Sequence, residues 1–293
     1  MKNNLIYSIV IVFLLNFDLF AENINISSKN IVVDKNSTIT IFKDEVLIED
    51  TKKNIIQSEY AEYNKKLNLI TLKNNVIAKD ALGNTIKTNK ALYNEKLKLF
   101  ESFGKTTIIT NEGSTIDTEN IIFDNLKNIV FSNKKTTLTE FQGHVITLEN
   151  FEYQTNTNIF KSIGKIKIID NLKNSYEFTQ IYLNERTREI VGSDSKLYFN
   201  QDNFKPNKDN KPRIFSNTIN INKDNSKFIK STFTLCDYRK EDKCPPWELS
   251  ASEMMHDKKK KTIFYDNAII KIYNIPIFYF PKLAHPDPTV KRR

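Results

Sequence analysis

The chain repeats itself every 30 residues, and this period restricts its possible folds more than any other feature. Aromatic residues recur at Tyr63, Tyr93, Phe123 and Tyr153. Isoleucine recurs in the same register at Ile56, Ile86, Ile116 and Ile146. A third apolar column contains Leu69, Leu99, Ile129 and Ile159. A fixed period of this length is typical of repeat architectures, in which copies of one supersecondary unit stack on each other.

Within each copy, apolar and polar residues alternate as they do in a half-buried β-strand. In the copy at residues 83–94, Ile86 and Thr88 occupy even positions, whereas Ala91 and Tyr93 occupy odd ones. The extra residue between the two halves predicts a β-bulge or a corner. Isoleucine and threonine are dense and no 3.6-residue stripe persists, so the pattern excludes a helix.

These patterns predict an all-β fold made of stacked hairpins. One hairpin alone is marginally stable, and stacking buries the apolar faces of successive copies. We expect an elongated β-jellyroll, or β-taco, of 30-residue hairpin repeats over residues 22–200, then a linker at 201–230 and a short β segment at 231–293. Its two ends would be unpaired strand edges, which can accept a strand from another chain.

The first 21 residues have the composition of a secretory signal peptide. Basic Lys2 precedes a mostly apolar run that ends at Phe20, and the small residue Ala21 is followed by a polar glutamate. The alternative is an uncleaved anchor helix, but the uninterrupted apolar segment at residues 9–15 is short for a hydrocarbon layer of about 30 Å. We therefore expect cleavage after Ala21 and export of the mature chain.

The net charge of +9 suits an anionic partner, such as a phosphorylated lipid or a membrane surface. It equally reflects the general abundance of lysine, because the basic residues are not confined to one segment. The sequence lacks the Arg-rich and Gly-aromatic motifs of RNA-binding proteins, so no nucleic-acid partner is expected.

No group of residues in the sequence points to catalysis. Three glutamates share one repeat position but lack calcium-binding Gly-Asp loops: Glu59, Glu119 and Glu149. Three histidines are scattered without metal-ligand spacing: His144, His256 and His285. We predict a protein that is not an enzyme, with no catalytic residue, metal site or cofactor. A polysaccharide-active β-helix enzyme is a weaker alternative, because it would need carboxylates clustered on one rung.

The chain has two cysteines, Cys236 and Cys244. An even number of cysteines in an exported protein suggests a disulfide. From their positions alone, they can pair with each other or with another part of a longer protein.

Two stretches of sequence resemble known families. The repeat motif Ile-x-Thr-x-x-Ala-x-Tyr-Asn at residues 86–94 resembles the OstA-type periplasmic domain that lipopolysaccharide transport proteins share. A sharper resemblance, to the LptD family of lipopolysaccharide-assembly proteins, lies between residues 232 and 293. It rests on the segments TFTLC, CPPWELSA, YDNA, PIFYFP and HPDPTVKRR, which occur there in the family's order.

The resemblance implies lipopolysaccharide transport and assembly at the Gram-negative outer membrane. The apolar columns would form a groove for acyl chains, lined by Ile56, Tyr63, Ile86, Tyr93, Ile116, Phe123, Ile146 and Tyr153. The alternative for each of these residues is a closed, dry core. A second hypothesis for the whole chain is a purely structural module that bridges periplasmic partners edge to edge.

The resemblance also implies partners and a location. The partners would be lipopolysaccharide and an OstA-type bridge protein similar to LptA, which would bind by edge-strand addition. An outer-membrane lipoprotein similar to LptE is expected only for a form that carries the family's membrane barrel. The location would be the periplasm or the periplasmic face of the outer membrane.

The chain departs from the LptD family at its end, because family members continue into a membrane barrel and this sequence stops at Arg293. Both a fragment and a natural short form are compatible with that end. Since the family's barrel cysteines are missing, the resemblance implies Cys236–Cys244 as the default disulfide. The proline-rich apolar segment at residues 276–288 is expected to plug or steer at a membrane mouth, or to be an ordinary linker.

Overall fold

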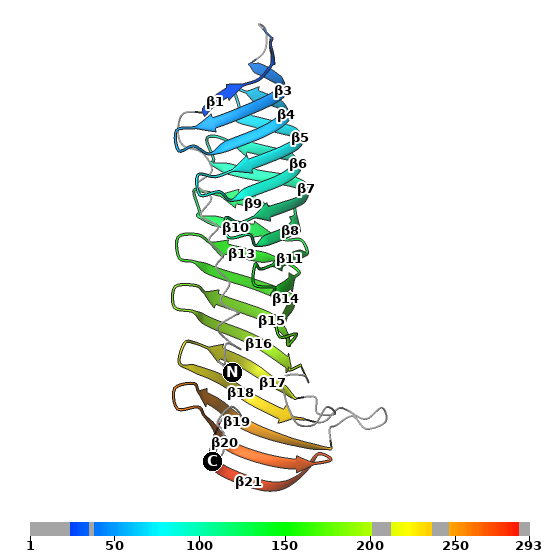
Figure 1. The fold of residues 1–293 in the computed structure, drawn as a ribbon, viewed down its shortest axis with the longest axis vertical. Helices are drawn as coiled ribbons and strands as arrows, with labels where there is room; N and C mark the ends of the chain where they lie inside the picture. The colour runs from blue at the N-terminus through cyan, green and yellow to red at the C-terminus, as the bar shows by residue number, and fades with distance from the viewer. Residues whose placement is uncertain (1–23, 35–37, 201–211, 236–245, 287–293) are drawn as a thin grey trace. The chain divides into compact units, whose positions relative to one another are not determined.

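The computed structural model describes residues 24–34, 38–200, 212–235 and 246–286, and these residues form 21 β-strands and no helix (Figure 1). The prediction of an all-β fold is confirmed. No helix in this part of the chain is long and apolar enough to cross a membrane. The expected signal peptide and both cysteines lie outside the described residues.

The chain divides into two compact units. The first unit consists of the described residues among 24–141 and 147–160, and the second of residues 142–146 and the described residues from 161 onward. Two strands have residues in both units: β12 (Val145–Leu148) and β14 (Ile159–Ile169).

Long antiparallel strands dominate the first unit. They are β3 (Ile39–Asp50), β4 (Ile55–Asn64), β5 (Leu69–Lys79), β6 (Thr85–Asn94) and β7 (Leu99–Ile109). Its shorter strands are β1 (Ile24–Ser27), β2 (Asn30–Val33), β8 (Thr115–Glu119), β9 (Ile122–Asp124), β10 (Ile129–Ser132), β11 (Thr136–Thr139) and β13 (Phe151–Gln154). Each of β3 to β6 pairs with the next strand in sequence, so one 30-residue repeat equals two strands of the sheet.

The sequence columns become rows of side chains that cross the sheet. Tyr63 lies opposite Ile70, which lies opposite Tyr93, and the row continues through Phe100 to Phe123. A second row contains Ile56, Ala78, Ile86, Ile108 and Ile116. The interval between equivalent residues is therefore set by the length of one hairpin.

Every long strand of the first unit bends near its middle, where the sequence predicted a bulge. On β6 the pairing register with β7 shifts between Thr88 and Lys90. On β5, Asn74 and Asn75 have φ angles of 62° and 52°, a left-handed conformation that asparagine tolerates better than most residues. Gly104 adopts φ 78° at the equivalent corner of β7.

The two halves of each bent strand line opposite walls of one interior. The pairing of β7 shows the division, because residues 105–109 pair with β8 whereas residues 99–101 pair with the separate strand β9. An electrostatic interaction between the two walls supports this arrangement. Tyr93, at the far end of β6, lies close enough to the Asp50 carboxylate of the other wall for that charge to help raise the pKa of its hydroxyl.

Side-chain amides connect the loops of neighbouring repeats. In the loop at residues 80–84, the Oδ1 atom of Asp80 accepts a hydrogen bond from the backbone N–H of Asn84 at 2.8 Å. The Oδ1 atom of Asn84 in turn accepts one from the backbone N–H of Asn111, one repeat further on, at 2.9 Å. Asn54 bonds Ala81 in the same way. The loops thus form a ladder, in which the buried asparagine of one loop accepts a hydrogen bond from the backbone of the loop one repeat further on.

The second unit is a meander of antiparallel strands, each paired with the next in sequence. Its strands are β15 (Ser175–Asn184), β16 (Glu189–Tyr198), β17 (Arg213–Ile221), β18 (Asn225–Thr234), β19 (Trp247–Asp257), β20 (Thr262–Ile272) and β21 (Ile275–Pro286).

Strands β17 and β18 occupy much of the interval for which the sequence suggested a linker, residues 201–230. Within that interval, residues 201–211 lie outside the described residues. The apolar alternation there is short, but Ile219, Ile221 and Phe228 are each at most 6 % exposed on the inner face. Abundant lysine, asparagine and aspartate conceal this alternation in the sequence.

The proline-rich segment lies within the short β segment that the sequence predicted for residues 231–293. Residues 275–286 form β21, whose only strand partner within the described residues is β20, and the role of this segment as a plug stays a prediction. An edge strand tolerates proline, because the missing N–H can face the unpaired side. Pro276 and Pro281 are therefore compatible with a β-strand at this place.

A close approach at Gly192 of β16 leads to a first stability prediction. A Cβ atom at Gly192 would lie 2.6 Å from Cδ1 of Phe178 and 3.0 Å from Cγ2 of Ile219. We expect Gly192→Ala to lower the free energy of unfolding by about 1–3 kcal/mol through overpacking. In urea denaturation, the same change should cost less in a Phe178→Leu background. Ser193→Ala, on the adjacent position, is the control, and an equal cost in both backgrounds would contradict the explanation.

Candidate functional site

The apolar columns face the interior, and most of the predicted groove residues are buried. In the first unit, Ile56, Ile86 and Ile116 are each 1 % exposed. The aromatic residues Tyr93, Phe123 and Tyr153 are exposed by 1 % or less, whereas Tyr63 is half-buried. In the second unit, Ile146 is 3 % exposed.

Side chains of the protein itself fill the interior at these columns. Phe100 and Phe123 meet edge to face with ring centroids 5.9 Å apart. Phe151 stacks on Phe160 at 6.2 Å. The structure thus shows the columns as a packed core, and an acyl chain could enter only if the two walls separate.

The third sequence column lies on the other face of the sheet. Its members are half-buried: Leu69, Leu99, Ile129 and Ile159. The interior instead receives the residue that follows each of them: Ile70, Phe100, Val130 and Phe160. The 30-residue spacing of this column is present in the structure. The face on which the column lies depends on where each strand begins after its turn.

A buried seam of hydroxyl groups runs along the corner of the first unit, and the sequence patterns did not reveal it as a feature. Ser102 and Thr106 lie 2.7 Å apart, and Thr106 donates to Thr88 at 3.3 Å. Further along, Thr118 lies 2.9 Å from Thr136. The sequence signal for this seam is the hydroxyl residue two positions after three of the four column isoleucines: Ser58, Thr88 and Thr118. These groups satisfy one another, so the corner is polar inside without holding free charges.

The tyrosine hydroxyls mark the far end of the first unit's interior. The Tyr63 hydroxyl donates to Glu95 at 3.0 Å, and the Tyr153 hydroxyl accepts from the side-chain amide of Asn158 at 3.2 Å. Burial and the carboxylates of Glu95 and Asp50 raise the pKa of Tyr93. These tyrosines therefore combine an apolar ring in the interior with a polar hydroxyl group at its end.

The candidate catalytic groups are not assembled into a site. Glu59, Glu119 and Glu149 are exposed, and Glu59 accepts a hydrogen bond from the side chain of Asn75. His285 bonds the hydroxyl of Tyr265 at 2.9 Å. Within the described residues, no group of three or more His, Cys, Asp or Glu could hold a metal ion.

His144 is the least expected of the three histidines. It is 1 % exposed, and neither ring nitrogen has a hydrogen-bond partner among the described residues. Burial lowers its pKa, although the Asp170 carboxylate opposes the shift. The ring is enclosed by the protein and offers almost no surface to a substrate.

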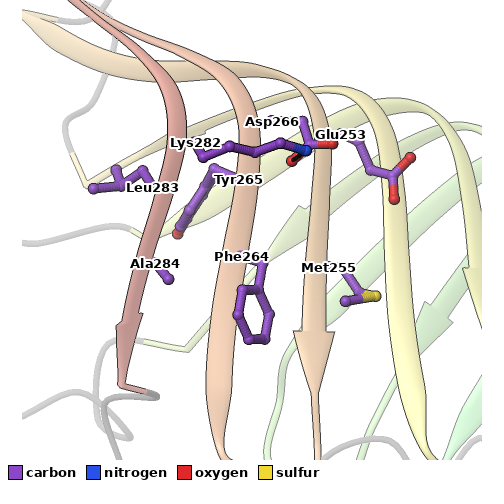
Figure 2. Close-up of a pocket in the computed structure, with 8 residues that line it drawn as sticks. All are labelled: Glu253, Met255, Phe264, Tyr265, Asp266, Lys282, Leu283 and Ala284. Atoms are coloured by element: carbon purple, nitrogen blue, oxygen red, sulfur yellow. Dashed lines mark ion pairs between the residues drawn. The ribbon is translucent and has the colours of Figure 1, made fainter.

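A pocket of about 450 Å³ lies on β19, β20 and β21 of the second unit (Figure 2). Met255, Phe264 and Ala284 form one cross-strand row of its wall. Two positions along the strands, on the same face, lies the row of Glu253, Asp266 and Lys282. Lys282 pairs with Asp266 at 2.7 Å, and Lys227 pairs with Glu253 at 2.7 Å. Its charges are therefore compensated within the protein, and none of the predicted groove residues lines it.

Comparisons with known proteins add little to the description of this site. No family model and no curated protein matches the chain. One similar solved structure is the crystal structure of LptH from Pseudomonas aeruginosa, described as the LptA-homologous periplasmic component of the conserved lipopolysaccharide transport device. It is 10 % identical, and the match covers 48 % of this chain and 82 % of that chain with a TM-score of 0.22. A superposition this loose has no bearing on function.

Proposed function

We propose that this protein is a periplasmic carrier of lipopolysaccharide that holds acyl chains between the walls of its bent β-repeats. The observation that supports the proposal is the inward-facing apolar column, which recurs in every repeat from Ile56 to Tyr153. The sequence resemblance to the OstA-type domain and to the LptD family supports the same assignment. Lipopolysaccharide is then the ligand, and an OstA-type protein is the partner that delivers it.

The energetics of transfer favour such a carrier. Burial of an acyl chain gains about 0.8 kcal/mol for each methylene removed from water. The columns continue from one repeat to the next, so a chain displaced from one rung meets equivalent apolar side chains on the following rung. The corner residues Asn74, Asn75 and Gly104 concentrate the bend of each strand in a few positions, and separation of the walls about this corner would admit the lipid.

Site-specific photocrosslinking tests the carrier function. A benzophenone amino acid at Ile86 or Ile116, which face the interior, should crosslink to lipopolysaccharide more efficiently than one at exposed Lys87 of the same strand. An Ile86→Lys change in a protein with its probe at Ile116 should abolish the lipid adduct. More adducts from position 87 than from the two interior positions would refute the carrier model.

A second function, a structural bridge between periplasmic partners, is favoured by the packed interior and by the exposed first edge of the sheet. Ile31, Val32 and Val33 of β2 are 54 %, 51 % and 63 % exposed. Among the described strands, β3 is the pairing partner of both β1 and β2. An unpaired apolar edge can accept a strand of a neighbour. Capture of an OstA-type partner, without any lipid adduct at positions 86 and 116, would support this bridge in place of the carrier.

A further inference from the structure

A row of lysines and aromatic rings crosses the first unit on its outer face. Lys43 pairs with Tyr60, Tyr60 with Lys73, Lys73 with Lys90, and Lys90 with Phe103. These five residues, here named the basic row, belong to the adjacent strands β3 to β7. Since neighbouring strands lie about 4.8 Å apart, the pairing register fixes the spacing of the whole row.

The basic row points to solvent, because its neighbours in sequence point inward. Phe42, Ala61, Leu72 and Ala91 are buried next to row residues. By contrast, the three lysines are exposed and Phe103 is 38 % exposed. The row is thus accessible over its whole length and separate from the interior columns.

Within the row, two lysines face each other without compensation. Lys73 and Lys90 are directly opposite on β5 and β6, and like charges at such positions are destabilising. Each ammonium group lies instead over the ring on its other side, Lys73 at 5.1 Å from the Tyr60 centroid and Lys90 at 5.0 Å from the Phe103 centroid. Each ammonium group is thus directed to a ring on the side away from the other lysine.

The neighbouring carboxylates form no ion pairs with these lysines. Among the described residues, none forms a salt bridge with Lys43, Lys73 or Lys90. The four acidic residues that flank Lys43 and Tyr60 in sequence hydrogen-bond to other groups: Glu62 accepts from the Tyr60 hydroxyl, Glu59 from Asn75, Glu45 from Lys29, and Asp44 from Asn30. The register therefore places two exposed lysines opposite each other, and neither has an ion-pair partner among the described residues.

We propose that the basic row is a binding site for a phosphorylated sugar. A phosphate group between Lys73 and Lys90 removes their repulsion and draws both ammonium groups away from the rings. The released ring of Phe103 then offers its face to the sugar. Lysine binds phosphate as a point charge, and a phosphate monoester carries about −1.5 to −2 charges at neutral pH. The site is on the outer face and does not depend on lipid carriage in the interior.

Titration of the mature protein with glucose 6-phosphate, followed by NMR of the lysine ε-methylene groups, tests the site. We expect saturable binding, with the ring-current shifts of Lys73 and Lys90 lost in the bound state. Lys73→Gln with Lys90→Gln should weaken binding about tenfold or more, because two charge-assisted contacts disappear. The matched control is Lys79→Gln with Lys87→Gln, which removes two exposed charges from the same strands and should change the affinity by less than about twofold.

Three further probes separate the possible ligands. Inorganic phosphate should bind more weakly than glucose 6-phosphate, and neutral glucose should not bind. Equal affinity for phosphate and glucose 6-phosphate would overturn the sugar assignment, and so would an unchanged preference in Phe103→Ala. Vesicles of phosphatidylglycerol that bind through Lys73 and Lys90, while glucose 6-phosphate does not bind, would overturn the proposal in favour of a membrane surface. An equal loss of affinity in the two double variants would show that binding depends only on net charge, and it would overturn the proposed site.

Discussion

Replacement of Phe100 with alanine is expected to lower the free energy of unfolding by about 3–5 kcal/mol, the range for deletion of a fully buried phenyl ring. Phe100 is 0 % exposed and contacts Phe123 across the interior rows at a centroid distance of 5.9 Å. Its loss leaves a cavity in a row that continues through Tyr93, so neighbouring repeats cannot close the gap independently. Urea denaturation followed by circular dichroism measures the change.

Phe103→Ala is the matched control, because the same side chain is removed from the same strand three residues further on. Phe103 is 38 % exposed at the outer corner, and we expect its loss to cost less than about 1 kcal/mol. Similar costs for the two variants would show that the interior row is not the core of the first unit. A large cost for Phe100 alone would separate the packed interior from the outer basic row.

The strand order and the inward columns could be predicted from the sequence because they depend on a single local rule. Alternation places Ile86 and Tyr93 on one face once the extra residue at the corner is counted, and the structure buries both. The same rule divides the residues of a strand between two faces but does not say which face points inward. It could not reveal that Leu99 faces outward while Phe100 fills the interior, since both are apolar and adjacent.

The features that the sequence did not reveal depend on contacts between repeats. Thr88 and Thr106 are ordinary strand residues until the register brings their hydroxyl groups within 3.3 Å. Lys73 and Lys90 are 17 positions apart, and only the pairing of β5 with β6 shows that their charges oppose each other. Periodicity reports which residues are equivalent, whereas register decides which residues touch.

In the ladder of loops, one repeat has a glutamate at a position where the other repeats have aspartate or threonine, and burial changes the pKa of this glutamate. At the first position of this loop, the first unit has Asp50, Asp80, Thr110 and then Glu140. Asp50 and Asp80 each accept hydrogen bonds from backbone and side-chain groups of the asparagine four residues later. Thr110 takes part in an equivalent bond with Ser114. Burial raises the pKa of Glu140 from its ordinary value of 4.5 to about 7, so this rung is titratable near neutral pH.

Glu140→Gln is therefore expected to stabilise the protein in a pH-dependent way. The pKa of the glutamate is higher in the folded state than in the unfolded state, so the glutamate becomes destabilising relative to glutamine as the pH rises from about 4.5 to 7. Above about pH 7 the gain should be constant, at about 2 kcal/mol once the shift is discounted for solvent screening. Below about pH 4.5 both side chains are neutral and the gain should vanish. Thermal unfolding at about pH 4 and pH 8 measures both limits.

Glu112→Gln provides the control for this prediction, because Glu112 is an exposed glutamate in the corresponding loop one repeat earlier. Its substitution removes the same charge from the surface and should change stability by less than about 0.5 kcal/mol at either pH. If Glu140→Gln stabilised the protein equally at both pH values, a new amide hydrogen bond would explain the gain and burial of the carboxylate would not. A gain that is absent at about pH 4 and complete at about pH 8 would identify desolvation of Glu140 as its cause.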